Sequence, residues 1–230
     1  MYGKIHELKL WARYAYDYIR WIFRYKNSEY AVKTFSLNSF TYSYFVHPYN
    51  HTWENERAIE IPVINDLVRK VSDGTILEVG NVLSHYFRIN HTILDKYEHG
   101  IGRKIINQDI ADWIPESHFD LIISVSTIEH IGWDEKPRNP QKVLIALRNI
   151  RNSLSPKGRA IITFPTGYNN VLDDGLKNGT INYEKCVCLK RVTKDNQWEA
   201  VGLDEALQCS YGVPYKNANA VIFLELTKLR

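Results

Sequence analysis

Acidic residues recur along the middle of the chain at points where short apolar segments end. Glu78 and Gly80 close the segment at residues 76–80, Asp95 closes the next segment, and Asp109 follows a third. If these segments are parallel strands, their carboxyl ends meet at one edge of a sheet, where acids can bind the hydroxyls and base of a nucleoside. The spacing therefore predicts a nucleoside site built from several strand ends.

A second pair of chemically capable side chains, Glu129 and His130, follows the apolar segment at residues 119–125. Histidine titrates near neutral pH and is suited to removing a proton from an acceptor. Glu129 suits binding of an acceptor hydroxyl equally well, and a histidine that only packs at a helix start is the structural alternative. Further candidates for the same pocket follow other strands: His85, Tyr86, Tyr168 and Asn169.

These residues need a scaffold that brings strand ends together. From Thr75 onward, short β-branched segments alternate with longer, partly amphipathic ones, which is typical of a parallel sheet with helices on both faces. We expect strands at residues 75–79, 92–95, 104–107, 119–125, 159–164, 186–192 and 220–226, the last two pairing antiparallel at the sheet edge. Helices are expected from Pro62 to Asp73 and over residues 140–154. The predicted fold is α/β, doubly wound and mostly parallel, with seven strands and an N-terminal helical extension.

The N-terminal part is expected to form a separate element at residues 1–55, followed by the α/β domain at residues 56–230. An apolar stripe at helical spacing predicts an amphipathic helix over residues 4–25, with basic residues opposite. The stripe consists of Leu8, Trp11, Ala15, Tyr18 and Ile22. Three surfaces suit such a helix: the domain itself, a second copy in a homodimer, or a membrane surface. The aromatic segment at residues 40–53 predicts either a lid or a packed connector.

Composition limits the classes of partner. A chain of 230 residues fits one domain with an extension. The net charge of +3, with acids spread throughout, does not favour nucleic acid. We find neither a signal peptide nor an apolar segment of the roughly 20 residues that cross a bilayer, so a cytoplasmic location is expected. Cys186, Cys188 and Cys209 are too few and too scattered for a disulfide scaffold, and no metal site is expected.

Several motifs, taken in order, resemble the class I S-adenosylmethionine-dependent methyltransferases. They are Ile-Leu-Glu-Val-Gly at 76–80, Asp95, Asp109, and the segments at residues 113–122, 124–131 and 154–159. The resemblance covers residues 75–167 well, the remaining C-terminal part loosely and the N-terminal part not at all. It implies S-adenosyl-L-methionine as cofactor and methyl transfer to an oxygen or nitrogen of a small-molecule or carbohydrate acceptor.

The resemblance also implies a role for each matching position near the first two strands. Glu78 would orient the glycine turn, and Gly80 and Asn81 would lie under the methionine part of the cofactor. Asp95 would bind the ribose hydroxyls.

The remaining implied roles fall at the third and fourth strand ends. Asp109, with the backbone of Ile110, would meet the adenine. Ser126 and Thr127 would flank the methionine and the methyl group that is transferred. His130 and Glu129 stay the candidate catalytic residues on the strength of their own chemistry, not of the resemblance.

One departure from the family pattern concerns the glycine turn. Val82 and Ser84 occupy positions where the family usually has glycine, and the Cβ of Val82 would push the turn outward. The alternative that this departure favours is a catalytically degenerate fold that serves as a binding or scaffold protein. A nicotinamide oxidoreductase is disfavoured because Gly80–His85 lacks two of the glycines of the Gly-x-Gly-x-x-Gly motif.

Overall fold

A central sheet dominates the computed structural model, which describes residues 15, 16, 18, 19, 32–99 and 105–228. Within this part of the chain the sheet has eight strands in the order β5-β4-β3-β6-β7-β10-β8-β9. Their bounds are β3 Ile76–Val79, β4 Thr92–Leu94, β5 Ile105–Ile106, β6 Phe119–Val125, β7 Leu154–Pro165, β8 Lys185–Arg191, β9 Trp198–Val201 and β10 Ala220–Thr227. The five strands from β5 to β7 are mutually parallel, whereas β10, β8 and β9 are antiparallel to their neighbours.

The register of the parallel strands brings their carboxyl ends to one edge of the sheet. Val79 at the end of β3 lies opposite Leu94 at the end of β4, which in turn lies opposite Ile106 of β5. The central strand β6 is buried at every position except Asp120. A strand covered on both faces is largely apolar, and the buried Ser124 is accommodated because its hydroxyl donates to the Val79 carbonyl at 3.0 Å.

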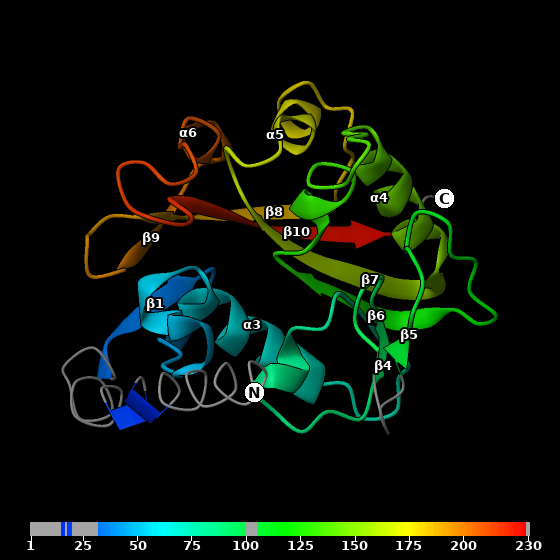
Figure 1. The fold of residues 1–230 in the computed structure, drawn as a ribbon, viewed down its shortest axis with the longest axis horizontal. Helices are drawn as coiled ribbons and strands as arrows, with labels where there is room; N and C mark the ends of the chain where they lie inside the picture. The colour runs from blue at the N-terminus through cyan, green and yellow to red at the C-terminus, as the bar shows by residue number, and fades with distance from the viewer. Residues whose placement is uncertain (1–14, 17, 20–31, 100–104, 229–230) are drawn as a thin grey trace, which may run out of the picture.

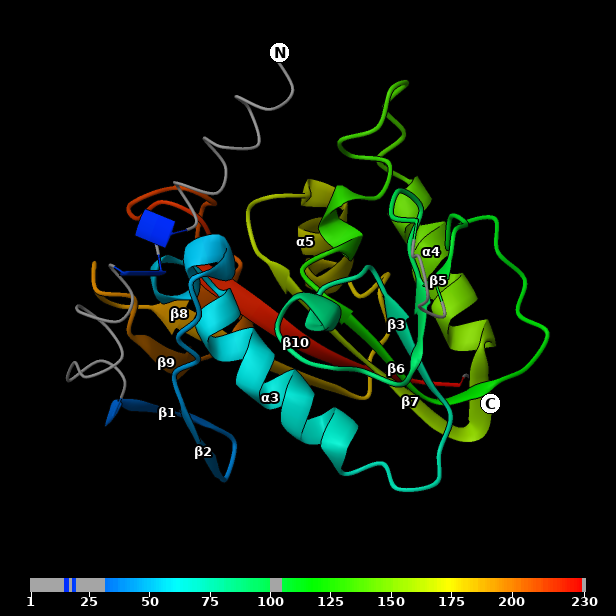
Figure 2. The ribbon, with the colours of Figure 1, turned by 60° about the horizontal axis from the view of Figure 1, so that its bottom comes forward.

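Helices cover both faces of this sheet. Helix α3 (Arg57–Arg69) packs on one face, while α4 (Lys142–Asn152) and α5 (Asn170–Lys177) lie on the other (Figures 1 and 2). The buried residues of α4 recur every three or four positions, as an amphipathic helix requires: Val143, Ala146, Leu147 and Ile150. The short helix α6 (Leu203–Ala206) and three 3-10 turns complete the fold: η1 (Tyr49–Glu54), η2 (Leu83–His85) and η3 (Ile128–His130).

The N-terminal region contributes a hairpin, β1 (Thr34–Leu37) with β2 (Phe40–Ser43). Its buried side chains share a core with Trp53, Trp198 and Phe223. The helix predicted over residues 4–25 lies outside the described residues except at positions 15, 16, 18 and 19, which are helical. Its contact with a membrane surface or a second copy stays a prediction. None of the helices in the described part of the chain is long and apolar enough to span a membrane.

Two predicted boundaries and the strand count differ from the structure. Helix α3 starts at Arg57, not at Pro62, and the proline lies inside it. Proline cannot donate to the Ala58 carbonyl, but that oxygen accepts a hydrogen bond from the Phe45 amide at 2.8 Å, which offsets the loss.

The strand expected at residues 159–164 starts earlier, because residues 154–158 also belong to β7, which pairs with β6 across a register shift. Pro156 is accommodated in the strand beside this irregularity. The sheet has eight strands because β9 also pairs with β8. The predicted antiparallel pair of β8 and β10 is present, but β9 forms the edge of the sheet.

Candidate active site

The turn after β3 depends on a glycine and on a buried acid. Gly80 has φ +87°, and a Cβ there would lie 2.4 Å from Oγ1 of Thr127. Only glycine adopts this conformation without strain and leaves this space. Oε1 of Glu78 accepts hydrogen bonds from the amides of Val82 (2.9 Å) and Leu83 (2.7 Å), while Nε2 of His91 lies 2.7 Å from its other oxygen. Glu78 therefore holds the turn in place.

The residue that replaces the second glycine causes no strain. Val82 has φ −111°, a conformation that every L-residue adopts readily. Because its amide is bound by Glu78, the chain turns directly into η2 at this point. The backbone of Val82 therefore shows no sign of the outward displacement that its Cβ was expected to cause.

Asp95 ties the loops after β3 and β4 together. Its Oδ2 accepts from the Asn81 amide at 2.9 Å, and its Oδ1 accepts from the amides of Tyr97 and Glu98 at 2.8 Å each. A carboxylate offers about four acceptor sites, so about one remains for a ligand hydroxyl. The Asn81 side chain is directed elsewhere: it donates to Glu98 and accepts from Ser84.

Asp109 lies in a group of four charges. Nζ of Lys142 donates to its Oδ2 at 2.5 Å, Nζ of Lys96 lies 2.9 Å from the same oxygen, and both ammonium groups also meet Glu135. Burial alone would raise the pKa of Asp109, but hydrogen bonds from Lys142, the Ala111 amide and Lys96 outweigh it and hold that pKa below its usual range. Asp109 is therefore ionised at neutral pH.

A cavity of about 420 Å³ lies at these strand ends, a size typical of small-molecule sites. It brings together six of the predicted residues: Gly80, Asp95, Asp109, Ile110, Thr127 and His130. The other four predicted residues, Glu78, Asn81, Ser126 and Glu129, do not line it. Glu78 and Asn81 instead shape its walls through their contacts with the loops.

His130 sits at the mouth of this cavity with its side chain half exposed. Its Nδ1 lies 2.6 Å from Oδ2 of Asp134, and the Tyr168 hydroxyl donates to the same oxygen at 2.7 Å. Burial would raise the pKa of Asp134, but these two hydrogen bonds lower it, so the carboxylate stays charged beside the imidazole. This arrangement orients the His130 imidazole.

Glu129 has the opposite environment. Its side chain is 2% exposed, its Oε2 has no hydrogen-bond partner, and its Oε1 lies 3.7 Å from Nε2 of His130. Burial raises the pKa of this carboxyl well above its usual value. The side chain of Asn169 donates to the Glu129 carbonyl at 2.9 Å and so fixes η3.

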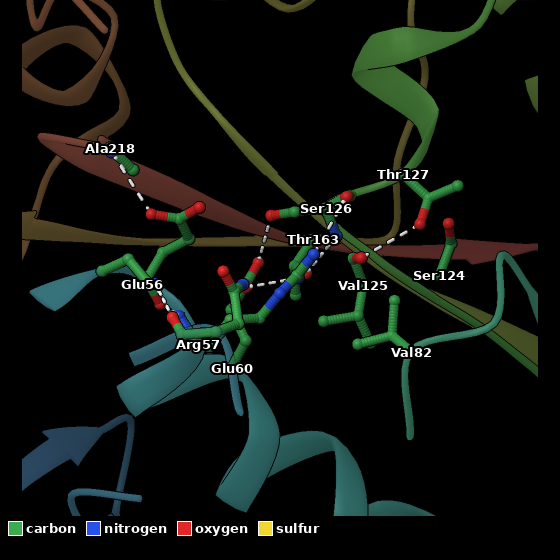
Figure 3. A network of polar contacts seen from close by, with 12 residues as sticks. Glu56, Arg57, Glu60, Val82, Ser124, Val125, Ser126, Thr127, Thr163 and Ala218 are labelled. Carbon is green, nitrogen blue, oxygen red and sulfur yellow. Dashed lines mark hydrogen bonds and ion pairs between the residues drawn. The ribbon is translucent and has the colours of Figure 1, made fainter. Parts of the chain in front are cut away.

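Ser126 faces α3 rather than the cavity (Figure 3). Its backbone has φ +34°, and its Oγ donates to Oε1 of Glu60 at 2.5 Å. The guanidinium of Arg57 bridges the pair: it lies 2.9 Å from the other oxygen of Glu60 and donates to the Ser126 carbonyl at 3.3 Å. The predicted site omitted Arg57 and Glu60. The sequence held one signal for this contact: Glu60 is an acid on the apolar face of the helix, to which Val63 and Ile64 also belong.

The aromatic segment at residues 40–53 meets two of the pocket candidates. Tyr49 stacks on His85 with ring centroids 4.6 Å apart, and Phe45 meets Tyr86 edge to face at 5.4 Å. Trp53, from the same segment, is buried in the core with the β1–β2 hairpin. Residues 45–49 therefore cover η2, while the rest of the segment packs on the domain.

The described residues include no group of three or more histidine, cysteine or acidic side chains that could hold a metal ion. Cys186 and Cys188 lie on β8 with their sulfur atoms 3.9 Å apart and are reduced.

Similarity to known proteins is confined to structure. No protein-family model matches the chain, and none of the curated proteins does. The N-methyltransferase NodS from Bradyrhizobium japonicum, solved with S-adenosyl-L-homocysteine, matches with a TM-score of 0.50 and 12% identity over 76% of this chain and 88% of that one. A TehB-like SAM-dependent methyltransferase from Corynebacterium glutamicum matches with a TM-score of 0.45 and 20% identity over 74% and 87%. From the NodS match, the chain has the fold of the class I S-adenosylmethionine-dependent methyltransferases.

Proposed function

We propose that this protein is an S-adenosylmethionine-dependent methyltransferase that acts on an oxygen or nitrogen of a small-molecule or sugar-like acceptor. One observation carries the proposal: the cavity at the carboxyl ends of β3, β4 and β5 unites the Gly80 turn with Asp95 and Asp109. Nucleoside ligands bind outside the carboxyl ends of parallel strands in open α/β sheets.

The residues present fit the cofactor. The Gly80 turn and Asp95 both line the cavity, and Asp95 keeps one acceptor site for a ribose hydroxyl. Asp109 and the backbone of Ile110 would hold the adenine, and Thr127 would lie beside the methionine part. In this proposal Asn81 and Ser126 support the loops instead of touching the cofactor. When bound, the cofactor supplies a methyl group activated by a positively charged sulfur.

The residues of the chain would align the acceptor with the methyl group and take up the proton that the acceptor loses. Alignment of two reactants can supply much of the acceleration for an in-line displacement. His130, held by Asp134 at the cavity mouth, is placed to take a proton from an acceptor hydroxyl or amine. The buried Glu129 beside it provides a second proton-holding group.

Titration calorimetry with S-adenosyl-L-homocysteine tests the proposal. We expect binding to the wild-type chain and a loss of roughly 10–100-fold in affinity in Asp95→Asn, because a charged hydrogen bond to the ribose contributes about 1.5–3 kcal/mol. Asn at this position keeps one acceptor oxygen for the loop amides. Asp112→Asn, an exposed acid in the next loop, serves as the matched control and should bind as the wild type does. Absence of binding to the wild type at millimolar ligand would overturn the proposal and favour the scaffold alternative.

A further inference from the structure

Three carboxyl groups converge beside the cofactor cavity. Glu60 projects from the N-terminal end of α3 toward Ser126 at the end of β6, and Glu56, just before this helix, points toward Ala218 (Figure 3). Glu129 belongs to η3. The charges of Glu60, Arg57 and Glu56 all act on the carboxyl of Glu129. Arg57 is the one cation among these four side chains, so the group has an excess of acid.

The hydrogen bonds of the described residues satisfy two of the three acids. Glu60 is paired with Arg57 and accepts from Ser126. Glu56 accepts from the amide of Ala218 at 3.3 Å. Oε2 of Glu129 is buried and has no hydrogen-bond partner among the described residues, which is costly for a polar atom. A donor from outside the chain, either a ligand or an ordered water, would satisfy it.

We propose that Glu129, with Glu56 and Glu60 behind it, binds the methyl acceptor through a basic amine, so that the protein is an N-methyltransferase of small amines. The inference rests on the proposed function and specifies its acceptor. The position is suitable because Thr127 and His130, which line the cofactor cavity, flank Glu129 in the sequence, and Nε2 of His130 lies 3.7 Å from its carboxyl. Glu129 does not itself line the cavity and its Oε2 is covered, so an amine in the cavity would meet this carboxyl once the side chain turns toward the edge at His130.

Two aromatic rings lie in contact, one after the other, beside His130. Tyr168 meets His130 edge to face at 4.9 Å and meets Tyr211 in the same way at 4.9 Å. Burial, together with the charges of Glu56 and Glu129, raises the pKa of Tyr211 to about 12, so its ring stays neutral beside the acids. Aromatic faces attract ammonium groups, which adds to the preference for a cation.

The protonation states make amine binding measurable. Burial raises the pKa of the Glu129 carboxyl well above its usual value and so favours the protonated carboxyl in the free protein, while a basic amine is protonated in solution. A bound ammonium favours the ionised carboxyl, so binding shifts Glu129 toward release of its proton. An alcohol of the same shape would release none.

The same arrangement prepares the nitrogen for reaction. The bound ammonium passes one proton to the Glu129 carboxylate, which leaves a lone pair on nitrogen. That lone pair forms the new N–C bond as the S–C bond breaks and its electron pair stays on sulfur. The products are the methylated ammonium and the neutral thioether, and the proton on Glu129 leaves to solvent. Charge and atoms balance in this step.

Calorimetry of matched ligand pairs tests the inference, with S-adenosyl-L-homocysteine already bound. We would compare tyramine with 4-(2-hydroxyethyl)phenol and glucosamine with glucose, in buffers of different ionisation enthalpy. At least one amine should bind roughly tenfold or more tightly than its alcohol counterpart, with net release of protons. Glu129→Gln should abolish the proton release while still binding S-adenosyl-L-homocysteine, which shows that the variant is folded. The exposed Glu116→Gln should behave as the wild type does.

Two results would overturn the inference without touching the proposed function. One is equal or undetectable affinity for both members of each pair while S-adenosyl-L-homocysteine binds. The other is proton release that persists in Glu129→Gln. Failure of S-adenosyl-L-homocysteine itself to bind would instead refute the proposed function.

Discussion

Replacing Gly80 by alanine should destabilise the protein through two separable terms. The backbone has φ +87°, and placing an L-residue in the left-handed region costs about 1–2 kcal/mol. The new Cβ would also lie 2.4 Å from Oγ1 and 2.5 Å from Cγ2 of Thr127. Overpacking of this kind costs about 1–3 kcal/mol. Together these terms predict a loss of roughly 2–5 kcal/mol in the free energy of unfolding.

Two control variants separate the terms. Gly179 has φ +76° but no atom within 4 Å of an added Cβ, so Gly179→Ala measures the backbone term alone. Thr127→Ala removes the two closest of the three clashing atoms and leaves only the Cβ at 2.9 Å, so the double variant Gly80→Ala/Thr127→Ala should recover most of the overlap term. A double-mutant cycle gives that recovery as a coupling energy, which we expect to be at least about 1 kcal/mol.

The assay is equilibrium urea denaturation, followed by S-adenosyl-L-homocysteine binding for each folded variant. Gly80→Ala should lose more stability than Gly179→Ala and should bind the ligand more weakly, since the side chain fills space beside the cavity. If both glycine variants lose the same stability and the cycle shows no coupling, the close contact between Gly80 and Thr127 is not what requires a glycine here.

Three further variants test other parts of the structure. Burial raises the pKa of Asp173 to about 6 from the usual 3.8, so its stabilising contribution is present below pH 3.8 and is lost as pH rises toward 6. Asp173→Asn should therefore gain at most about 3 kcal/mol at neutral pH and show a flatter pH profile of unfolding; parallel profiles would contradict this. Tyr44→Phe removes the oxygen that accepts from the buried Trp198 amide at 2.8 Å and should cost about 1–3 kcal/mol in urea denaturation, so an unchanged midpoint would be inconsistent with that bond. Lys142→Met removes the ammonium nearest Asp109, so a carbon-13 NMR titration should show a higher pKa for Asp109, and an unchanged titration would argue against the contact.

Local sequence patterns were sufficient to predict the scaffold. The strands at 119–125 and 92–95 and the helix at 140–154 were predicted within a few residues of their observed bounds, because strand-like and helical periodicities are properties of neighbouring residues. The acids at the strand ends followed from the same patterns. Asp95 and Asp109 line one cavity because parallel strands end at a common edge.

The sequence by itself determined an α/β sheet with polar residues at its carboxyl edge, since each segment carries its own pattern. Only the tertiary structure decided which of those residues face the cavity and which are buried against α3. Ser126 turned toward Glu60, 66 positions away in the chain, and Arg57 toward Ser126 across 69. Burial and the choice of partner depend on residues that are far apart in sequence, and no local pattern encodes them. For the same reason, the unpaired carboxyl of Glu129 became evident only in the folded chain.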